Sequence, residues 1–218
     1  MVRLVVMAAG AATRMGQDKL ALPWGTSTVL GHVLQVTLKA IDILNNTVFD
    51  PTVMEPDLTK VELIVVARKP IDSYLGGTTI QAFQQHCGIW IEVPNPQPLS
   101  ETIRSGLKGV SEVLQGVCFI PGDQVGLEPC VFAELIQSFI KTHPGFLIPC
   151  ADSITGSPVF FNREYLPELE NLQGEQGGKA ILAAHPESWI TYPVNSGLFN
   201  DVDTIEVYNH LWNKEHTH

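Results

Sequence analysis

Positive charge is scarce in this chain, and the scarcity excludes one large class of function. Among 218 residues, 13 lysines and arginines stand against 23 aspartates and glutamates, which gives a formal net charge of −10. A protein that binds nucleic acid generally presents a basic surface to the phosphate backbone. We therefore expect no nucleic-acid partner, and cations that lie close together in such a chain are candidates for an anion site.

Paired cysteines and long apolar runs are also missing. The four cysteines form no C-x-x-C pair, which favours reduced thiols over a zinc site or a disulfide framework: Cys87, Cys118, Cys130 and Cys150. No apolar run reaches the ~18 residues that indicate a membrane span. The first residues lack the basic, apolar and cleavage regions of a secretory signal. We therefore expect a cytoplasmic protein with no membrane partner.

Apolar runs alternate with helical periodicity along the chain. Four runs predict buried strands: Arg3–Met7, Val61–Ala67, Ile89–Val93 and Gly116–Ile120. Helices are predicted over residues 29–38, 72–86, 100–114 and 129–141. Later strands are predicted at 146–149, 157–161, 189–194 and 197–199, later helices at 163–171, 176–185 and 204–212, and a surface excursion at 45–60. This order is typical of the α/β class, and predicts a Rossmann-like three-layer fold with a mostly parallel sheet.

The first strand leads into a loop of small residues with two nearby cations, Arg14 and Lys19. Small residues let the backbone approach a ligand closely, and successive N–H groups in a loop form an anion-binding concavity. This loop and two later polar positions, Asn95 and Asp123, follow predicted strands, at the edge where such sheets bind ligands. The sequence therefore predicts a phosphate site there. Neither the G-x-x-x-x-G-K-[ST] phosphate loop nor the G-x-G-x-x-G dinucleotide motif is present.

The loop carries a longer pattern with fixed spacing. Its parts are Ala8-Ala9-Gly10, Arg14-Met15-Gly16, Lys19 and Leu22-Pro23. They resemble the signature of MobA-like nucleotidyltransferases, A-[AG]-G-x-x-x-R-M/F-G-x-x-K-x-L-L-P. The resemblance implies a single domain over 1–218 of the nucleotide-diphospho-sugar transferase type. Residues 1–127 would form its nucleotide-binding half and residues 128–218 its acceptor-binding half.

Later segments extend the resemblance along nearly the whole chain. They are Asn95-Pro96 with Ser100 and Ser105-Gly106, Pro121–Gln124, Gly156–Val159, Gly174–Lys179, and Asp201–Thr204 with Glu206. Three positions depart from the family pattern. Val125 and Ile205 stand where proline is usual, and Val207 stands where an acid is usual.

The resemblance implies a particular reaction. Members that transfer a cytidylyl group to the molybdenum cofactor usually read A-A-G in the first loop, as this chain does at Ala9, whereas guanylyl-transferring members read A-G-G. The expected activity is transfer of CMP from CTP to the phosphate of molybdopterin, with release of pyrophosphate. A molybdenum hydroxylase apo-enzyme is a possible further partner.

Charge assigns roles to the candidate residues. Two phosphates must meet, so the expected cofactor is Mg²⁺, which proteins usually hold with one or two carboxylates plus substrate phosphates. Asp123 is the first candidate ligand, with Asp203 and Asp201 competing for the second place or simply capping the last helix. Lys19 and Arg14 would neutralise the triphosphate and the departing pyrophosphate.

The remaining candidates divide between the two substrates. Expected contacts to the nucleotide come from Ala8, Ala9, Gly10, Arg14, Gly16, Lys19, Asn95, Ser100 and Gly122. Expected contacts to the acceptor come from Gly156, Pro158, Gly177, Gly178 and Lys179. Asn95 and Ser100 fit a turn and a helix start equally well, and the glycines near 177 fit a simple turn.

Several alternatives stay open at this point. One is GTP-dependent guanylyl transfer to the molybdenum cofactor, and another is transfer to a different phosphorylated acceptor. A third, of another class, is a non-catalytic carrier or insertion chaperone for the cofactor. The preserved Lys19 and Asp123 favour an enzyme over a carrier.

Overall fold

A computed structural model describes residues 1–10, 15–47, 61–93 and 95–216 of the chain. Arg14, one of the expected catalytic residues, lies outside the described residues, as does most of the predicted excursion over 45–60. No helix among the described residues is long and apolar enough to cross a membrane.

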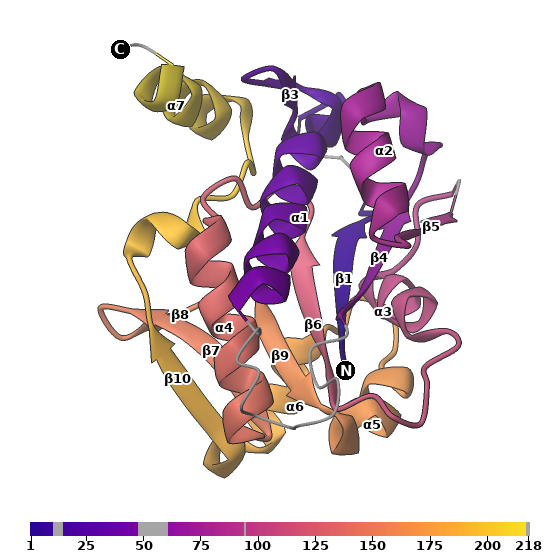
Figure 1. Cartoon of the computed structure of the whole chain (residues 1–218), viewed down its shortest axis with the longest axis vertical. Coiled ribbons are helices and arrows are strands. Elements are labelled where there is room, and N and C mark those ends of the chain that lie inside the picture. Colours follow the sequence, from indigo (N-terminus) through magenta and orange to yellow (C-terminus); the bar gives the residue numbers. More distant parts are fainter. Residues whose placement is uncertain (11–14, 48–60, 94, 217–218) are drawn as a thin grey trace.

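One sheet runs through the middle of the molecule, in the order β10-β7-β9-β6-β1-β4-β5, with β8 paired to β7 (Figure 1). Its strands are β1 Val2–Ala8, β4 Val61–Ala67, β5 Ile89–Glu92, β6 Gly116–Pro121, β7 Phe146–Ala151, β8 Ile154–Thr155, β9 Val159–Asn162 and β10 Trp189–Pro193. β1 pairs in parallel with both β4 and β6. Only β8 and β9 run antiparallel to their neighbours in this sheet. The predicted mostly parallel α/β sheet is therefore confirmed.

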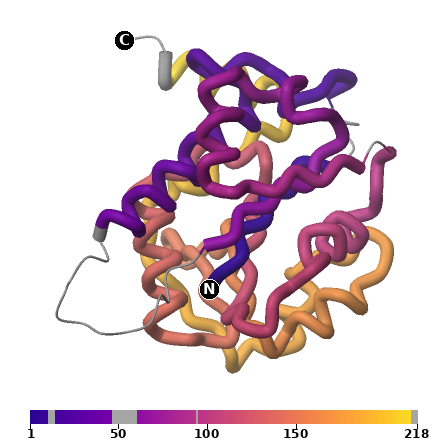
Figure 2. Tube along the Cα trace, turned by 45° about the vertical axis from the view of Figure 1, so that its right-hand side comes forward, coloured from indigo at the N-terminus to yellow at the C-terminus, as the bar shows by residue number. Residues whose placement is uncertain are grey.

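Helices cover both faces of the sheet, in which β1 lies between β6 and β4 (Figure 1 and Figure 2). The α-helices are α1 Val29–Thr47, α2 Gly77–Gln85, α3 Leu99–Leu107, α4 Pro129–Thr142, α5 Leu166–Glu170, α6 Gly178–Ala184 and α7 Ile205–His216. Successive residues of β1 point to opposite faces. Leu4 and Val6 join one hydrophobic cluster with α1 and α4, while Val5 joins another with α3, α5 and α6. Both faces are covered, which explains why β1 is apolar throughout its length except at Arg3.

Short elements account for most differences from the prediction. They are a hairpin of β2 Pro23–Trp24 and β3 Ser27–Thr28, and the 3₁₀ turns η1 Lys19–Ala21, η2 Ile71–Ser73, η3 Arg163–Tyr165, η4 Pro186–Ser188 and η5 Ser196–Phe199. The predicted strand at 197–199 is wrong. It is the 3₁₀ turn η5, because the Asn195 side chain accepts a hydrogen bond from the Gly197 N–H and starts a turn.

The predicted helix over 100–114 is also too long, since α3 ends at Leu107. Gly109 has a φ of +66°, a conformation that leaves the helix. Val110 and Leu114 still pack into the core, but from the turn that follows the helix. Their apolar character therefore reflects burial in the core. Because their spacing is also helical, the sequence predicts a helix that extends beyond its true end.

The last helix closes over the first hairpin. The Tyr208 hydroxyl donates to the Pro23 carbonyl at 2.7 Å, and the Tyr208 and Trp212 rings lie 5.9 Å from the Trp24 ring. Figure 1 shows α7 beside β3 at one end of the molecule. This packing anchors the chain immediately after the acidic segment 201–203.

A buried arginine ties β1 to the end of α3. The Arg3 side chain is 3% exposed. It donates to Glu62 Oε2 at 2.8 Å and to three backbone carbonyls, those of Gly106, Lys108 and Gly109, at 2.8 to 3.2 Å. These carbonyls end a helix, where no intrahelical donor is available.

We expect Arg3→Met to lower the free energy of unfolding by about 2–3 kcal/mol, because it leaves Glu62 and three carbonyls, one of them buried, without their donor. Urea unfolding followed by circular dichroism measures the change. The matched control is Arg163→Met, at an exposed position, which should change stability by less than ~0.5 kcal/mol. Equal stability of the two variants would contradict this role.

Candidate active site

A cavity of about 1060 Å³ opens beyond the carboxyl ends of the central strands. Its lining includes Gly10 after β1, Arg68 after β4, and Asp123 after β6. Parallel sheets bind ligands at this edge. The cavity therefore lies where the sequence predicts the site.

Lys19 lies between two carboxylates from distant parts of the chain. Its Nζ donates to Asp123 Oδ2 and, at 3.3 Å, to Asp203 Oδ1. Burial lowers the pKa of Lys19, but the charges and hydrogen bonds of the two aspartates outweigh it, so that the pKa is raised. The lysine is therefore held in its charged form beside the cavity.

Backbone pairing brings the acidic C-terminal segment to Asp123. Gln124 and Asp201 form an antiparallel bridge, and the Val202 N–H donates to the Asp123 carbonyl at 3.0 Å. Burial, followed by the charges of Asp123 and Asp203, raises the pKa of Asp201 to about 7. The Asp201 Oδ1 atom is buried and has no hydrogen-bond partner among the described residues. Asp123, Asp201 and Asp203 therefore form an acidic cluster, and among the described residues Lys19 is the cation that pairs with it.

The donor set suits a hard divalent cation. Asp123 and Asp201 supply carboxylate oxygens at the cavity. Oδ1 of Asp201 has no hydrogen-bond partner among the described residues and could therefore bind a cation. In the part of the chain that the structure describes, no group of three or more His, Cys, Asp or Glu side chains forms a complete metal site. Mg²⁺ and similar ions fit such an incomplete set, because substrate phosphates and water complete their coordination.

Asp18 fixes the loop immediately before Lys19. It accepts from the Leu20 N–H at 3.2 Å, from the Tyr74 hydroxyl at 3.0 Å and from Lys69 Nζ at 2.8 Å. Burial raises the pKa of Asp18, but Lys69 and Tyr74 lower it by more, and the net pKa is lowered. The sequence analysis missed Asp18, although an aspartate next to the predicted phosphate lysine could have suggested a positioning role.

Arg68 is the second functional candidate that the sequence analysis missed. It follows the last residue of β4, lines the cavity, and has a side chain only 19% exposed. Its position after a predicted strand, in a chain poor in cations, is the signal that could have identified it.

Gln124, directly after Asp123, joins the two sides of the cavity. Its side chain is buried, and Nε2 donates to the Ser157 carbonyl at 2.7 Å and to the Leu198 carbonyl at 2.9 Å. The turn at Ser157 belongs to the segment that was predicted to bind the acceptor. Gln124 therefore holds that turn next to the acidic cluster.

Close-packed glycines frame the side of the cavity that the sequence predicts to bind the acceptor. Gly156, Gly177, Gly178 and Lys179 line it, together with Phe161. A Cβ atom at Gly178 would lie 2.4 Å from the Phe161 ring, so only glycine permits this approach.

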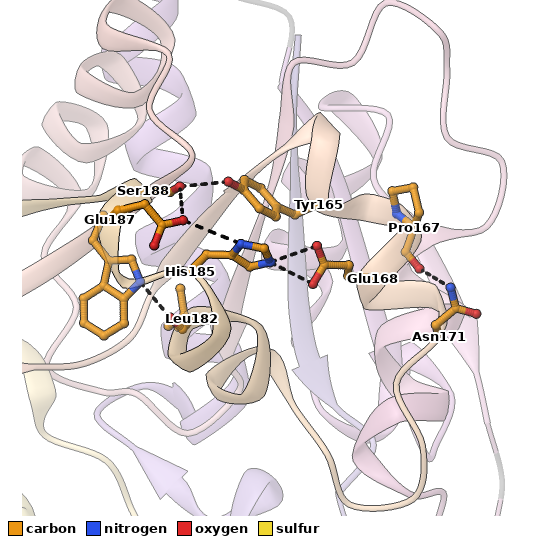
Figure 3. A network of polar contacts seen from close by, with 9 residues as sticks. Tyr165, Pro167, Glu168, Asn171, Leu182, His185, Glu187 and Ser188 are labelled. Carbon is orange, nitrogen blue, oxygen red and sulfur yellow. Dashed lines mark hydrogen bonds and ion pairs between the residues drawn. The ribbon is translucent and has the colours of Figure 1, made fainter.

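The far end of α6 is anchored by a polar network, drawn in Figure 3. His185 Nε2 lies 3.0 and 3.1 Å from the two Glu168 carboxylate oxygens, and Nδ1 lies 3.8 Å from Glu187. The Tyr165 hydroxyl donates to Ser188 Oγ at 3.0 Å. These contacts fix the helix that carries Lys179 against its neighbours.

The structure brings about half of the described site candidates to the cavity. Those in its lining are Gly10, Lys19, Asp123, Asp201, Gly156, Gly177, Gly178 and Lys179. Those outside the lining are Ala8, Ala9, Gly16, Asn95, Ser100, Gly122, Pro158 and Asp203.

Gly122 and Ser100, which lie outside the lining, make backbone contacts to other segments. The Gly122 N–H donates to the Met7 carbonyl at 3.0 Å, and the Ser100 N–H donates to the Gly174 carbonyl at 3.2 Å. Ser100 lies within α3 and is fully buried, with its hydroxyl oxygen unpartnered among the described residues.

Residues 4–189 match the MobA-like NTP transferase domain, so the chain belongs to this family of nucleotidyltransferases. The resemblance predicted from the first loop is thereby confirmed. No curated protein matches the sequence.

Solved structures share the fold across the whole chain. Rv0371c from Mycobacterium tuberculosis H37Rv is 23% identical, with 97% of each chain covered and a TM-score of 0.71, and it has also been solved in complex with manganese. Molybdopterin-guanine dinucleotide biosynthesis protein A from Archaeoglobus fulgidus is 16% identical, with 100% of each chain covered and a TM-score of 0.60. A CMP:2-keto-3-deoxy-manno-octonic acid synthetase complexed with CTP is 13% identical, covers 99% of this chain and 98% of its own, and has a TM-score of 0.63. These likenesses confirm the nucleotide-diphospho-sugar transferase type of fold.

Proposed function

We propose that this nucleotidyltransferase transfers CMP from CTP to the phosphate of molybdopterin and releases pyrophosphate. The observation that carries the proposal is the meeting of Lys19 with Asp123 and Asp203 at the cavity of a MobA-like domain. Ala9 supports CTP, through its resemblance to the cytidylyl-transferring branch. The Archaeoglobus relative, named for molybdopterin-guanine dinucleotide biosynthesis, supports a molybdopterin acceptor.

Nucleotidyl transfer needs positioning and charge neutralisation more than covalent chemistry. In the proposed mechanism, Lys19 turns from its carboxylates toward the triphosphate and stabilises charge at the α-phosphate. The Gly10 loop holds the β- and γ-phosphates, and Arg14 neutralises the departing pyrophosphate. No general base is required, because a phosphate monoester is already ionised near neutral pH.

We assign Asp123 and Asp201 as the residues that would hold a divalent cation, Mg²⁺ or Mn²⁺. Both line the cavity, and Asp201 Oδ1 has no other partner among the described residues. Asp203 is not part of the cavity lining and its side chain is 57% exposed, so we do not assign it as a ligand. The ion would neutralise the two phosphates and orient them for in-line transfer. The manganese complex of Rv0371c is consistent with a divalent ion in this fold.

The proposed acceptor site lies in the second half, residues 128–218. Gly156, Gly177 and Gly178 let the acceptor approach the backbone, and Lys179 adds the positive charge that a phosphorylated acceptor requires. Phe119 and Trp189 supply apolar surface for a flat ring system. A cytoplasmic location and a molybdenum hydroxylase as recipient stay predictions from the sequence.

The decisive test is pyrophosphate release from CTP, GTP, ATP or UTP, each with Mg²⁺ and molybdopterin. We expect release with CTP only when molybdopterin is present, and little with UTP or ATP. Preference for GTP would replace the cytidylyl assignment with guanylyl transfer, the activity that the name of the Archaeoglobus relative suggests. Binding of molybdopterin without pyrophosphate release from any nucleotide would instead identify a carrier.

A further inference from the structure

Arg68 is a largely buried cation with few polar partners among the described residues. Its guanidinium carries five N–H donors. The only polar contact it makes within the described residues is a 3.9 Å ion pair from its terminal NH2 nitrogen to Asp18 Oδ1, and its Nε is buried without a partner. Buried donors without acceptors are costly, so a ligand is the natural source of acceptors for this side chain.

The carboxylate that pairs with Arg68 is already engaged by other donors. Asp18 already accepts closer hydrogen bonds from Lys69, Tyr74 and the Leu20 N–H. It therefore attracts Arg68 by charge while leaving its donors free. Arg68 itself lines the cavity.

The order of the strands places Arg68 away from the reacting phosphate. Asp123 follows β6 and Arg68 follows β4, with β1 and its loop between them. Neighbouring strands lie ~4.8 Å apart, so the two strand spacings between β6 and β4 separate these positions by about 10 Å. Because Lys19 and Asp123 would bind the α-phosphate, Arg68 faces a part of the nucleotide well removed from it.

We propose that Arg68 reads the nucleobase, by donating two parallel hydrogen bonds to a pair of adjacent acceptor atoms on the edge of the base. This inference rests on the proposed use of a nucleotide. A guanidinium fork requires two neighbouring acceptors. Cytosine offers N3 and O2, and guanine offers O6 and N7. Uracil has a donor at N3 between its two carbonyl acceptors, and adenine has its N6 donor between N1 and N7, so both are disfavoured.

The same fork would also fit a phosphate, and the experiment must separate the two ligands. Isothermal titration measures binding of CTP, UTP and inorganic tripolyphosphate, each with Mg²⁺, to the wild type and to Arg68→Gln. Arg68→Lys keeps the charge but loses the fork. The matched control is Arg163→Gln, at an exposed position on η3.

We expect the wild type to prefer CTP over UTP by about tenfold or more, the usual discrimination of a bidentate pair. Both Arg68 variants should reduce this ratio to near one and leave tripolyphosphate affinity within about twofold, while Arg163→Gln changes neither quantity. An unchanged ratio of CTP affinity to UTP affinity in the two variants would overturn this inference and leave the proposed function intact. An equal loss of CTP and tripolyphosphate binding would overturn it in favour of a phosphate contact. A wild type that binds no nucleotide would overturn the proposed function, and the inference with it.

Discussion

We expect Lys19→Met and Asp123→Asn each to lower kcat for nucleotidyl transfer by about 10³-fold while the protein stays folded. Each substitution removes a full charge from the place where phosphate charge must be stabilised, and such losses typically cost 10²–10³-fold or more. The two side chains contact each other directly beside the cavity. Pyrophosphate release under saturating CTP and Mg²⁺ measures the loss, and circular dichroism reports the fold.

Charge-matched variants away from the cavity serve as controls for this prediction. Lys141→Met, on α4, and Asp152→Asn, in the turn between β7 and β8, change the same charges at exposed positions. We expect both to turn over at the wild-type rate. Normal turnover by Lys19→Met and Asp123→Asn would show that the reaction takes place elsewhere.

The two variants should also differ from each other in metal binding. Asp123→Asn removes a proposed ligand, so Mn²⁺ affinity measured without nucleotide should fall by about 10-fold or more. Lys19→Met removes a cation that competes for the same carboxylates. The Mn²⁺ affinity of Lys19→Met should therefore stay the same or increase, although this variant loses nucleotidyl transfer.

Local sequence patterns were sufficient to predict the candidate site residues that follow strands. Lys19 and Asp123 could be predicted because β1 and β6 are largely apolar runs that end in recognisable loops. Their carboxyl ends meet because parallel strands share an edge. Because cations are scarce in this chain, Lys19 was a candidate for binding an anion.

Contacts between distant segments could not be predicted in the same way. The bridge between Gln124 and Asp201 depends on how the chain returns after β10, which no local pattern encodes. For the same reason the sequence could not choose between Asp201 and Asp203. Arg68 was not predicted as a site residue, because Arg-Lys-Pro after a strand is also typical of an exposed turn.

We infer that the acidic cluster lowers the stability of the metal-free protein. Asp201 is half-buried beside two other aspartates, and one of its oxygens has no partner among the described residues. Sites that await a ligand commonly keep such unfavourable arrangements. The stability and the activity of the protein should therefore respond in opposite directions when this carboxylate is neutralised.

Asp201→Asn should raise the stability of the metal-free protein at pH 8 while lowering activity by about 10²-fold. The pKa of Asp201 is raised to about 7 in the folded protein, against ~3.9 in an unfolded chain. The folded state therefore loses stability as the pH rises from about 4 to 7, and the loss is complete above that window. We expect the variant to recover on the order of 2 kcal/mol, or about 4–8 °C in Tm, in EDTA at pH 8.

The pH and metal responses distinguish this explanation from a simple packing effect. At pH 5 the gain in Tm should shrink, because the wild-type carboxyl is then largely protonated. Mn²⁺ should stabilise the wild type more than the variant, which has lost a proposed ligand. Asp203→Asn is the matched control for stability, since its exposed side chain should shift the metal-free Tm by only about 1 °C. A lower metal-free Tm for Asp201→Asn at pH 8, or an undiminished response to Mn²⁺, would refute the assignment of Asp201 as the second metal-binding carboxylate.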